Sequence, residues 1–281
     1  MKRSLFFYIV IVALLFFPSL LKAQVQLIPT TIVLDRSGVG TVMVVNTSDE
    51  PREISISTEF SYNVSDSLGF SVDAEDYSEL ETYDISENLL IYPPRFVLGG
   101  GERRDIRVQH RMGPGMPDGG YFSRFIVKAE PMAQDAVQEE DPETISVQLN
   151  YVFVQDIPLY HFYGDATTGI EIRNMTLVEP EDDPDSFILV FDMDKKGNAP
   201  YRGSVDIVIK DESGDVVVEE NRQVGLFTDR KIGLRFNKEE FTAQETYTAD
   251  FTFQTKRTSS SPQDLVQAPD VKYSNDFTLR E

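Results

Sequence analysis

The sequence predicts an all-β protein built from two immunoglobulin-like sandwich domains. Apolar and polar residues alternate along short segments, which places one row of side chains on each face of a strand. Gly, Pro, Asn and Asp separate these segments, and no long stretch has the period of an amphipathic helix. Hydrophobic residues make up 41% of the 281 residues, with 19 Phe and 12 Tyr, so each half can bury a core. Seven or more short strands at this spacing are typical of an immunoglobulin-like sandwich.

Residues 1–23 have the pattern of a signal peptide. Lys2 and Arg3 precede an apolar run over residues 5–17, and Ala23 ends a candidate cleavage site, Leu21-Lys22-Ala23. The apolar run is short for a spanning helix. We therefore expect secretion with cleavage and no membrane insertion afterwards; an uncleaved anchor is the alternative.

The chain is strongly acidic. Its formal net charge is −21, and loss of Lys2, Arg3 and Lys22 with the signal peptide makes it −24. Such a charge repels polyanions, so nucleic acid and anionic membranes are excluded as partners. The chain has no cysteine, so hydrophobic burial must stabilise it even in an oxidising compartment.

The first domain is expected over residues 24–163. Pro93 and Pro94 lack amide donors, so we expect the chain to change sheets or lie at an edge there, with a cis bond as one option. Three glycines at 99–101 allow positive φ in the next turn. The strands are expected at residues 25–28, 31–34, 40–46, 52–60, 89–92, 95–98, 103–109, 121–129 and 144–160.

The second domain is expected over residues 164–281, because the strand pattern stops at Gly164 and Asp165 and then begins again. Two sandwiches joined by a short segment leave a cleft between them. An acid-rich segment at 132–143 predicts a loop that frees the beginning of the strand after it. The strands of the second domain are expected at residues 170–178, 186–194, 203–210, 216–219, 222–227, 231–236, 246–254 and 272–279.

The last strand of the first domain carries a row of apolar side chains on one face. Because side chains alternate along a strand, five residues project together. Two interpretations are open: the domain covers this row itself, or the strand offers the row to another protein. The five residues are Ile145, Val147, Leu149, Tyr151 and Phe153.

The order of motifs over residues 24–162 resembles the amino-terminal domain of periplasmic pilus-assembly chaperones of the chaperone-usher type. This resemblance implies a periplasmic chaperone that caps incomplete secreted pilus or fimbrial subunits by donor-strand complementation and delivers them to an outer-membrane usher. The apolar row would then be the donor strand. The motifs are VQLIPTTIVLD, GTVMVVNTSDEPREISI, IYPPRFVLGGGERRDIRV, DGGYFSRFIVKAEP, an acidic loop and a strand ending in DIPLY.

The resemblance also indicates where the terminal carboxylate of a subunit is held. The best-known branch uses an Arg in the first strand and a Lys in the last, but here those positions correspond to Thr31 and Pro158. SRFIVKAEP and DIPLY are more similar to the archaic or alternative branch, whose penultimate-strand Arg matches Arg124. Lys128 lies four residues on along the same face. Arg124 and Lys128 are therefore the candidate anchors, because Arg can hold a carboxylate through two parallel hydrogen bonds; structural salt bridges are the alternative for both.

Nothing in the sequence indicates an enzyme, a cofactor or a metal site. There is no cysteine, only two histidines, and no hydrolase elbow or phosphate-binding loop. The acidic run at 179–185 is interpreted as a solvated loop rather than a calcium site. Two other functions stay open, namely a structural or adhesive envelope protein of two such domains and a secreted hydrolase that uses paired carboxylates. The pattern leaves open self-association of the free form.

Overall fold

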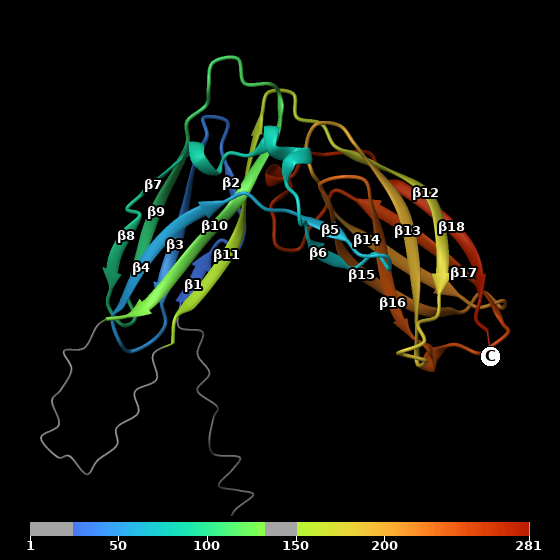
Figure 1. Ribbon diagram of the computed structural model, residues 1–281. Helices are drawn as coiled ribbons and strands as arrows, with labels where there is room; N and C mark the ends of the chain where they lie inside the picture. Colours follow the sequence, from blue (N-terminus) through green and yellow to red (C-terminus); the bar gives the residue numbers. More distant parts are fainter. Residues whose placement is uncertain (1–24, 133–150, 281) are drawn as a thin grey trace, which may run out of the picture.

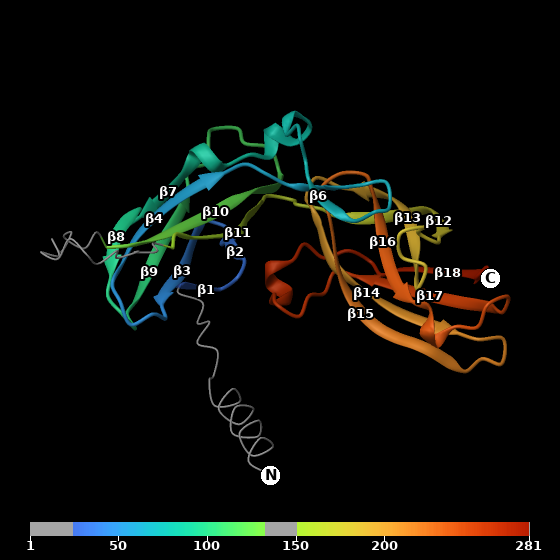
Figure 2. The ribbon, with the colours of Figure 1, turned by 60° about the horizontal axis from the view of Figure 1, so that its bottom comes forward.

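Two β-sandwiches meet at an angle and form an arch (Figure 1). The computed structural model describes residues 25–132 and 151–280. Figure 2 shows the concave side of the arch, with η4 (Pro262–Asp264) between the two sandwiches. In this described part, no helix is long and apolar enough to cross a membrane. The predicted all-β fold with two immunoglobulin-like sandwiches is confirmed.

The N-terminal sandwich packs a four-stranded sheet on a five-stranded one. All strand pairs are antiparallel except β2 with β11, which is parallel. Cis peptide bonds at Ile28–Pro29 and Tyr92–Pro93 lie where the chain crosses from one sheet to the other, as the double proline predicts. The first sheet, in spatial order, is β1 (Val25–Ile28), β3 (Val39–Asn46), β9 (Arg103–His110) and β7 (Leu89–Tyr92); the second is β2 (Ile32–Leu34), β11 (Phe153–Tyr163), β10 (Gly119–Pro131), β4 (Arg52–Glu59) and β8 (Arg95–Leu98).

The C-terminal sandwich packs a three-stranded sheet on a four-stranded one. The two strands predicted at 216–219 and 222–227 are one continuous strand, because the polar residues between them pair with β14 and Asn221 donates to Asp206 Oδ1 at 2.6 Å. The first sheet is β12 (Gly169–Val178), β13 (Ser186–Lys196) and β16 (Arg230–Asn237); the second is β15 (Val216–Leu226), β14 (Tyr201–Lys210), β17 (Thr246–Gln254) and β18 (Val271–Thr278), with η3 (Lys238–Glu240) after β16.

Each sandwich has its own hydrophobic core between its sheets. Phe125 on β10 and Ile106 on β9 are fully buried in the first core, and Phe187 and Phe253 are fully buried in the second. Each such side chain contributes roughly 1.5–3 kcal/mol of burial free energy. Two independent cores explain how the chain folds without disulfides.

Asn46 is a polar residue fully buried at the end of β3. Its Nδ2 donates to the carbonyls of Glu50, Leu98 and Gly99, at 2.7, 3.0 and 3.1 Å. Its Oδ1 accepts from the Ser48 amide and hydroxyl. Because buried carbonyls need partners, this one side chain ties the turn after β3 to the turn after β8.

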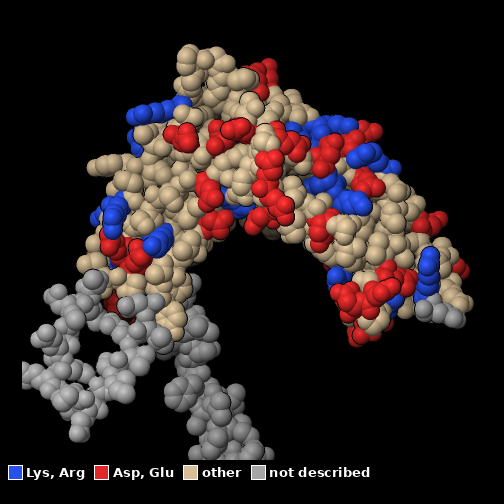
Figure 3. Space-filling view, in the orientation of Figure 1, with Lys and Arg blue, Asp and Glu red and all other residues tan. Residues whose placement is uncertain are grey.

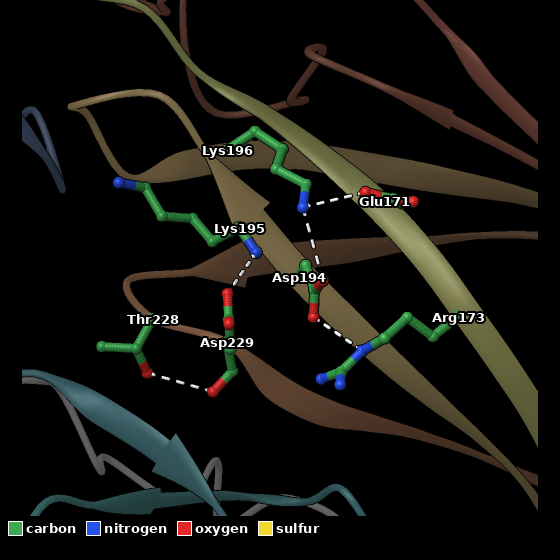
Figure 4. Close-up of polar contacts among 7 residues, drawn as sticks. All are labelled: Glu171, Arg173, Asp194, Lys195, Lys196, Thr228 and Asp229. Carbon is green, nitrogen blue, oxygen red and sulfur yellow. Dashed lines mark hydrogen bonds and ion pairs between the residues drawn. The ribbon is translucent and has the colours of Figure 1, made fainter.

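A network of charged residues holds β12 against β13 on the outer surface (Figure 4). Asp194 Oδ1 lies 2.7 Å from Arg173 Nε in an ion pair, Asp194 Oδ2 accepts from Lys196 at 3.3 Å, and Lys196 also bridges to Glu171 at 2.8 Å. These contacts are largely solvent-exposed, so each adds little to stability. We interpret the network as structural.

The segment between β4 and β7 contains elements that the sequence pattern did not predict. It forms a small hairpin, β5 (Asn63–Ser65) with β6 (Ser71–Asp73), and two short 3-10 helices, η1 (Ser78–Tyr83) and η2 (Ser86–Asn88). Figure 1 and Figure 2 show the hairpin leaving the N-terminal sandwich and lying along β16.

The hairpin contacts the second sandwich through its backbone. The Gly233 amide donates to the Gly69 carbonyl at 2.9 Å, and the Lys231 amide donates to Ser65 Oγ at 3.1 Å. Gly69 has φ of 84°, and a Cβ added there would lie 2.2 Å from the Gly233 nitrogen. Only glycine fits this close approach.

The joint between the sandwiches is fixed by Asn198, which lies in the turn before β14. Its Nδ2 donates to the Asp118 carbonyl at 2.9 Å, and its Oδ1 accepts from the Thr167 amide at 2.7 Å. The Gly120 amide donates to the Asn198 carbonyl at 3.0 Å. One residue of the second sandwich therefore holds both β10 and the connecting segment.

Candidate functional site

The outer backbone edge of β11 is unpaired over half of its length. On that edge, β2 pairs with β11 only at Leu159, Tyr160 and His161. From Phe153 to Pro158, β11 pairs with β10 alone among the described residues. An exposed strand edge carries free amide and carbonyl groups, so it can accept a strand from another chain.

Apolar side chains are exposed at the start of this edge. Tyr151, Val152 and Val154 are 60%, 48% and 64% exposed. The β10–β11 ladder ends at the Ala129–Phe153 pair, although β10 continues to pair with β4. Before Phe153 the chain thus no longer pairs with β10, and its apolar side chains are exposed there.

The predicted donor row is only partly within the described structure. Ile145, Val147 and Leu149 lie outside the described residues. Tyr151 is exposed, whereas Phe153 is half-buried and packs against the core of its own sandwich. Within the described part of the row, Phe153 thus packs on its own sandwich and Tyr151 is exposed to solvent.

Arg124 lies beside this edge, at the end nearest the second sandwich. It is the register partner of Pro158 on β11. Its Nη2 donates to Asn63 Oδ1 at 2.9 Å, and its Nη1 lies 3.3 Å from Asp156 Oδ2. The residue that the sequence suggests as an anchor is therefore adjacent to Pro158, where the best-known branch has its Lys.

Lys128 lies farther from the second sandwich along β10. Its Nζ is 2.9 Å from Glu130 Oε1. Arg124 lines a cavity between the two sandwiches and Lys128 does not, so the structure does not bring the two candidate anchors together.

A cavity of about 400 Å³ lies between the two sandwiches. Its walls come from β10 and β11, from β14 and β15, from the start of β16 and from the β5–β6 hairpin. Phe122, Tyr160 and Phe227 form an aromatic side of it, with Phe122 and Phe227 ring centres 4.7 Å apart. A cavity of this size and shape fits a short segment of a polypeptide.

Five arginines line this cavity, and no aspartate or glutamate does. This is the opposite of the whole chain, which has 47 acidic and 26 basic residues. Figure 3 shows Asp and Glu spread over the visible face, with Lys and Arg collected in a few groups. The cavity is thus an anion-attracting site in an acidic protein. The five are Arg124, Arg202, Arg222, Arg230 and Arg257.

Arg202 comes from the C-terminal sandwich and reaches the N-terminal one. Its guanidinium carbon lies 4.1 Å from the ring centre of Tyr160 on β11, a cation–π contact. It also donates to the Asp264 carbonyl at 3.3 Å and to Ser260 Oγ at 3.4 Å. Burial lowers the pKa of Arg202, and burial lowers that of Arg230 as well.

The sequence reasoning missed the four arginines of the second sandwich. All four come from separate segments, namely β14, β15, β16 and the loop after β17, so no local motif joins them. Arg202 is buried together with its neighbours from Tyr201 to Val205, which only the folded structure reveals. A charged side chain within a buried strand indicates a specific partner.

The hydrolase alternative finds no support in the described carboxyl groups. A general acid in such an enzyme needs a raised pKa. The carboxyl groups with a shifted pKa, which are Asp35, Asp76, Glu179 and Asp250, all have it lowered by hydrogen bonds. Within the described ranges no group of three or more potential metal ligands occurs.

No model of a protein family matches the sequence, and no curated protein matches it either. The chain is similar over most of its length to solved structures of fimbrial chaperones. One is a complex of the chaperone CsuC with the tip adhesion subunit CsuE from archaic chaperone-usher Csu pili of Acinetobacter baumannii. It has 14% sequence identity and a TM-score of 0.43, and the match covers 89% of this chain and 98% of that chain.

Two further similar structures are the class 5 fimbriae chaperone CfaA and the Salmonella enterica pilin SafA in complex with the chaperone SafB. The first has 14% identity and a TM-score of 0.44, covering 89% of this chain and 98% of that one. The second has 15% identity and a TM-score of 0.42, covering 91% and 96%. Because these values are low, the functional proposal rests on the residues of this chain.

Proposed function

We propose that this chain is a periplasmic chaperone that caps incomplete secreted pilus or fimbrial subunits by donor-strand complementation. The observation that carries the proposal is the unpaired edge of β11 from Phe153 to Pro158, which ends beside Arg124. A guest that lacks a strand has an apolar groove and free backbone groups of its own. Pairing the two edges gives the free backbone groups of both proteins hydrogen-bond partners.

The geometry favours a guest strand that ends inside the cleft. Beyond Pro158 the same edge of β11 is occupied by β2, so a guest strand has to stop there. At that point Arg124 offers a guanidinium to a terminal carboxylate, with two parallel hydrogen bonds. A guest with its carboxyl end at Arg124 and its body toward Phe153 runs parallel to β11.

The apolar row before Phe153 would supply most of the binding free energy. Burying a large aliphatic side chain is worth roughly 1.5–3 kcal/mol, so Ile145, Val147 and Leu149 together contribute about 5–9 kcal/mol before ordering costs. Backbone hydrogen bonds along Phe153 to Pro158 add register but little sequence specificity. We also propose secretion by the signal peptide and delivery of the subunit to an outer-membrane usher.

Co-expression with a secreted subunit encoded beside this chain tests the proposal. Val147→Ser with Leu149→Ser is expected to abolish co-purification of the subunit while leaving the melting temperature of the free chain unchanged. Arg124→Gln is expected to weaken capture, with Lys128→Gln as a matched control that removes a charge from the same strand face outside the cavity.

The result that overturns the proposal is unfolding of the free chain when Val147 and Leu149 are changed. Those side chains would then serve the protein's own core, as in a structural or adhesive envelope protein. Undiminished capture by the doubly substituted chain would also overturn it.

A further inference from the structure

The cavity contains more positive charge than one terminal carboxylate requires. Arg124 already has a carboxylate partner in Asp156, and Arg222 has one in Glu220 at 2.6 Å. By contrast, no carboxylate among the described residues lies within ion-pair distance of Arg202, Arg230 or Arg257. Arg230 donates to the Asn63 carbonyl at 3.5 Å and is attracted by Asp66, whereas Asp264 acts on Arg202 only from beyond ion-pair distance. Arg202 and Arg257 therefore line one cavity without a carboxylate in direct contact.

Both groups are held in place by neutral contacts. Arg202 is 6% exposed and is positioned by Tyr160, Ser260 and the Asp264 carbonyl. Arg257 donates through Nη1 to the Val224 carbonyl at 3.2 Å, and its buried Nε has no partner in the described structure. A buried N–H without an acceptor is costly, which indicates an acceptor that arrives from outside.

The two guanidinium groups also act on each other. The charge of Arg257 lowers the pKa of Arg202, in addition to the larger effect of burial. Bringing two cations together in a partly dry cavity is unfavourable unless an anion joins them. This is the arrangement that a bound carboxylate would stabilise.

We propose that Arg202 and Arg257 form a second anion subsite, which binds an acidic side chain near the carboxyl end of the guest polypeptide. The inference rests on the proposed function, because it assumes that the terminal carboxylate of the same guest lies at Arg124. The ligand class is thus a polypeptide whose last residues carry an Asp or Glu in addition to the terminal carboxylate.

The spacing between the two subsites suits one short segment. Arg202 stacks on Tyr160, which lies two residues beyond Pro158 on the same face of β11, and Pro158 is the register partner of Arg124. Two residues of a strand span roughly 7 Å. Because Tyr160 lies beyond the residue at which the guest strand stops, a side-chain carboxylate on the last residue of the guest is the one best placed to cover this separation.

The test uses the full-length mature chain and short synthetic peptides at low ionic strength. The peptides alternate Val and Thr and end in a free carboxylate, with one Glu at the last, second-last or third-last position. Matched peptides carry Gln in place of Glu, and another set ends in an amide. Binding is measured by fluorescence anisotropy for the wild-type chain and for Arg124→Gln, Arg202→Gln, Arg257→Gln and Lys210→Gln.

For the wild-type chain we expect one position of Glu to bind about tenfold or more tightly than Gln, as a charge-assisted hydrogen bond predicts. Arg202→Gln and Arg257→Gln each remove this preference and keep the loss that amidation causes. Arg124→Gln keeps the preference for Glu over Gln and removes the loss of binding that amidation causes. Lys210→Gln removes a positive charge from β14 outside the cavity, where Lys210 is paired with Asp250, so it leaves both effects intact.

Three results would overturn the inference. They are equal binding of Glu and Gln peptides by the wild-type chain, an unchanged preference in both Arg202→Gln and Arg257→Gln, and no binding of any peptide. If Arg202 only joins the two sandwiches, Arg202→Gln lowers the melting temperature without changing the Glu-to-Gln ratio, and Arg257→Gln has no effect on that ratio. Failure of the proposed function is distinct, since it appears as undiminished subunit capture after donor-row substitution.

Discussion

The two histidines of the chain form a buried pair that makes stability sensitive to acid. His110 on β9 and His161 on β11 are 4% and 0% exposed, and their Nδ1 atoms are 2.8 Å apart. One ring must donate and the other accept, so the contact requires at least one neutral ring. The pair joins the two sheets of the N-terminal sandwich.

Burial lowers the pKa of His110 from 6.5 to about 4, and the charge of His161 adds a smaller effect in the same direction. Burial also lowers the pKa of His161, although the nearby Asp35 acts to raise it. The unfolded chain takes up a proton near pH 6.5, whereas folded His110 does so only near pH 4. The stability is therefore present above pH 6.5 and is lost as the pH falls to 4. A difference of about 2.5 pH units, at about 1.4 kcal/mol per unit, amounts to about 3 kcal/mol at pH 4.

The assay is thermal unfolding across this pH range, with NMR titration of the two histidine rings. A loss of about 3 kcal/mol lowers the melting temperature of the N-terminal sandwich by about 6–12 °C. His110→Gln should be less stable at neutral pH but should lose less between pH 6.5 and 4, since the chain has only two histidines. Ring titration near 6.5 in the folded chain, or equal pH dependence of variant and wild type, would refute the reasoning.

Three further predictions concern the contacts that fix the two sandwiches. Gly69→Ala places a Cβ against the Gly233 backbone and should release the β5–β6 hairpin, seen as faster proteolysis there, whereas Gly214→Ala has a similar φ of 86° with open space and should not. Asn198→Ala loses four side-chain hydrogen bonds and should cost about 2–3 kcal/mol in chemical denaturation, while Asn198→Asp keeps the bond from the Thr167 amide but turns a carboxylate oxygen toward the Asp118 and Asp165 carbonyls and should cost at least as much. Asn46→Ala removes a donor from three carbonyls, of which Glu50 keeps the Ser48 hydroxyl and Gly99 keeps the Glu102 amide, and should cost about 1–3 kcal/mol; a loss below 1 kcal/mol would contradict the buried network.

Period-two patterning was enough to predict the fold because each strand has one buried row. In β17, the buried residues Tyr247, Ala249, Phe251 and Phe253 alternate with half-buried ones, and the predicted boundaries match. In β15 the same pattern failed, because the polar residues Glu220 and Asn221 indicated a break between two strands. They stay in the strand because β14 pairs with it continuously. Pairing with β14, rather than the local polarity of the sequence, determines that these residues form a strand.

The candidate site was predicted only where it follows one strand. The family resemblance suggested Arg124 and alternation suggested the apolar row, and the two lie close together because β10 and β11 are consecutive, paired strands. The β5–β6 hairpin was missed because its strands have three residues each and little buried alternation. Arg202 and Arg257 were missed because their shared cavity exists only after the two sandwiches meet.

The angle between the sandwiches therefore determines what the cleft can bind. Arg124 belongs to the first sandwich, and Arg202 and Arg257 belong to the second, so a guest that contacts both subsites needs one fixed separation. The β5–β6 hairpin and Asn198 provide that restraint, because each contacts both sandwiches. Releasing the hairpin through Gly69→Ala should then weaken binding of a peptide with two carboxylates more than that of a peptide with one, because only the first depends on the relative position of the sandwiches. Equal weakening of both peptides would mean that the hairpin supports Arg124 alone, through its contact with Asn63.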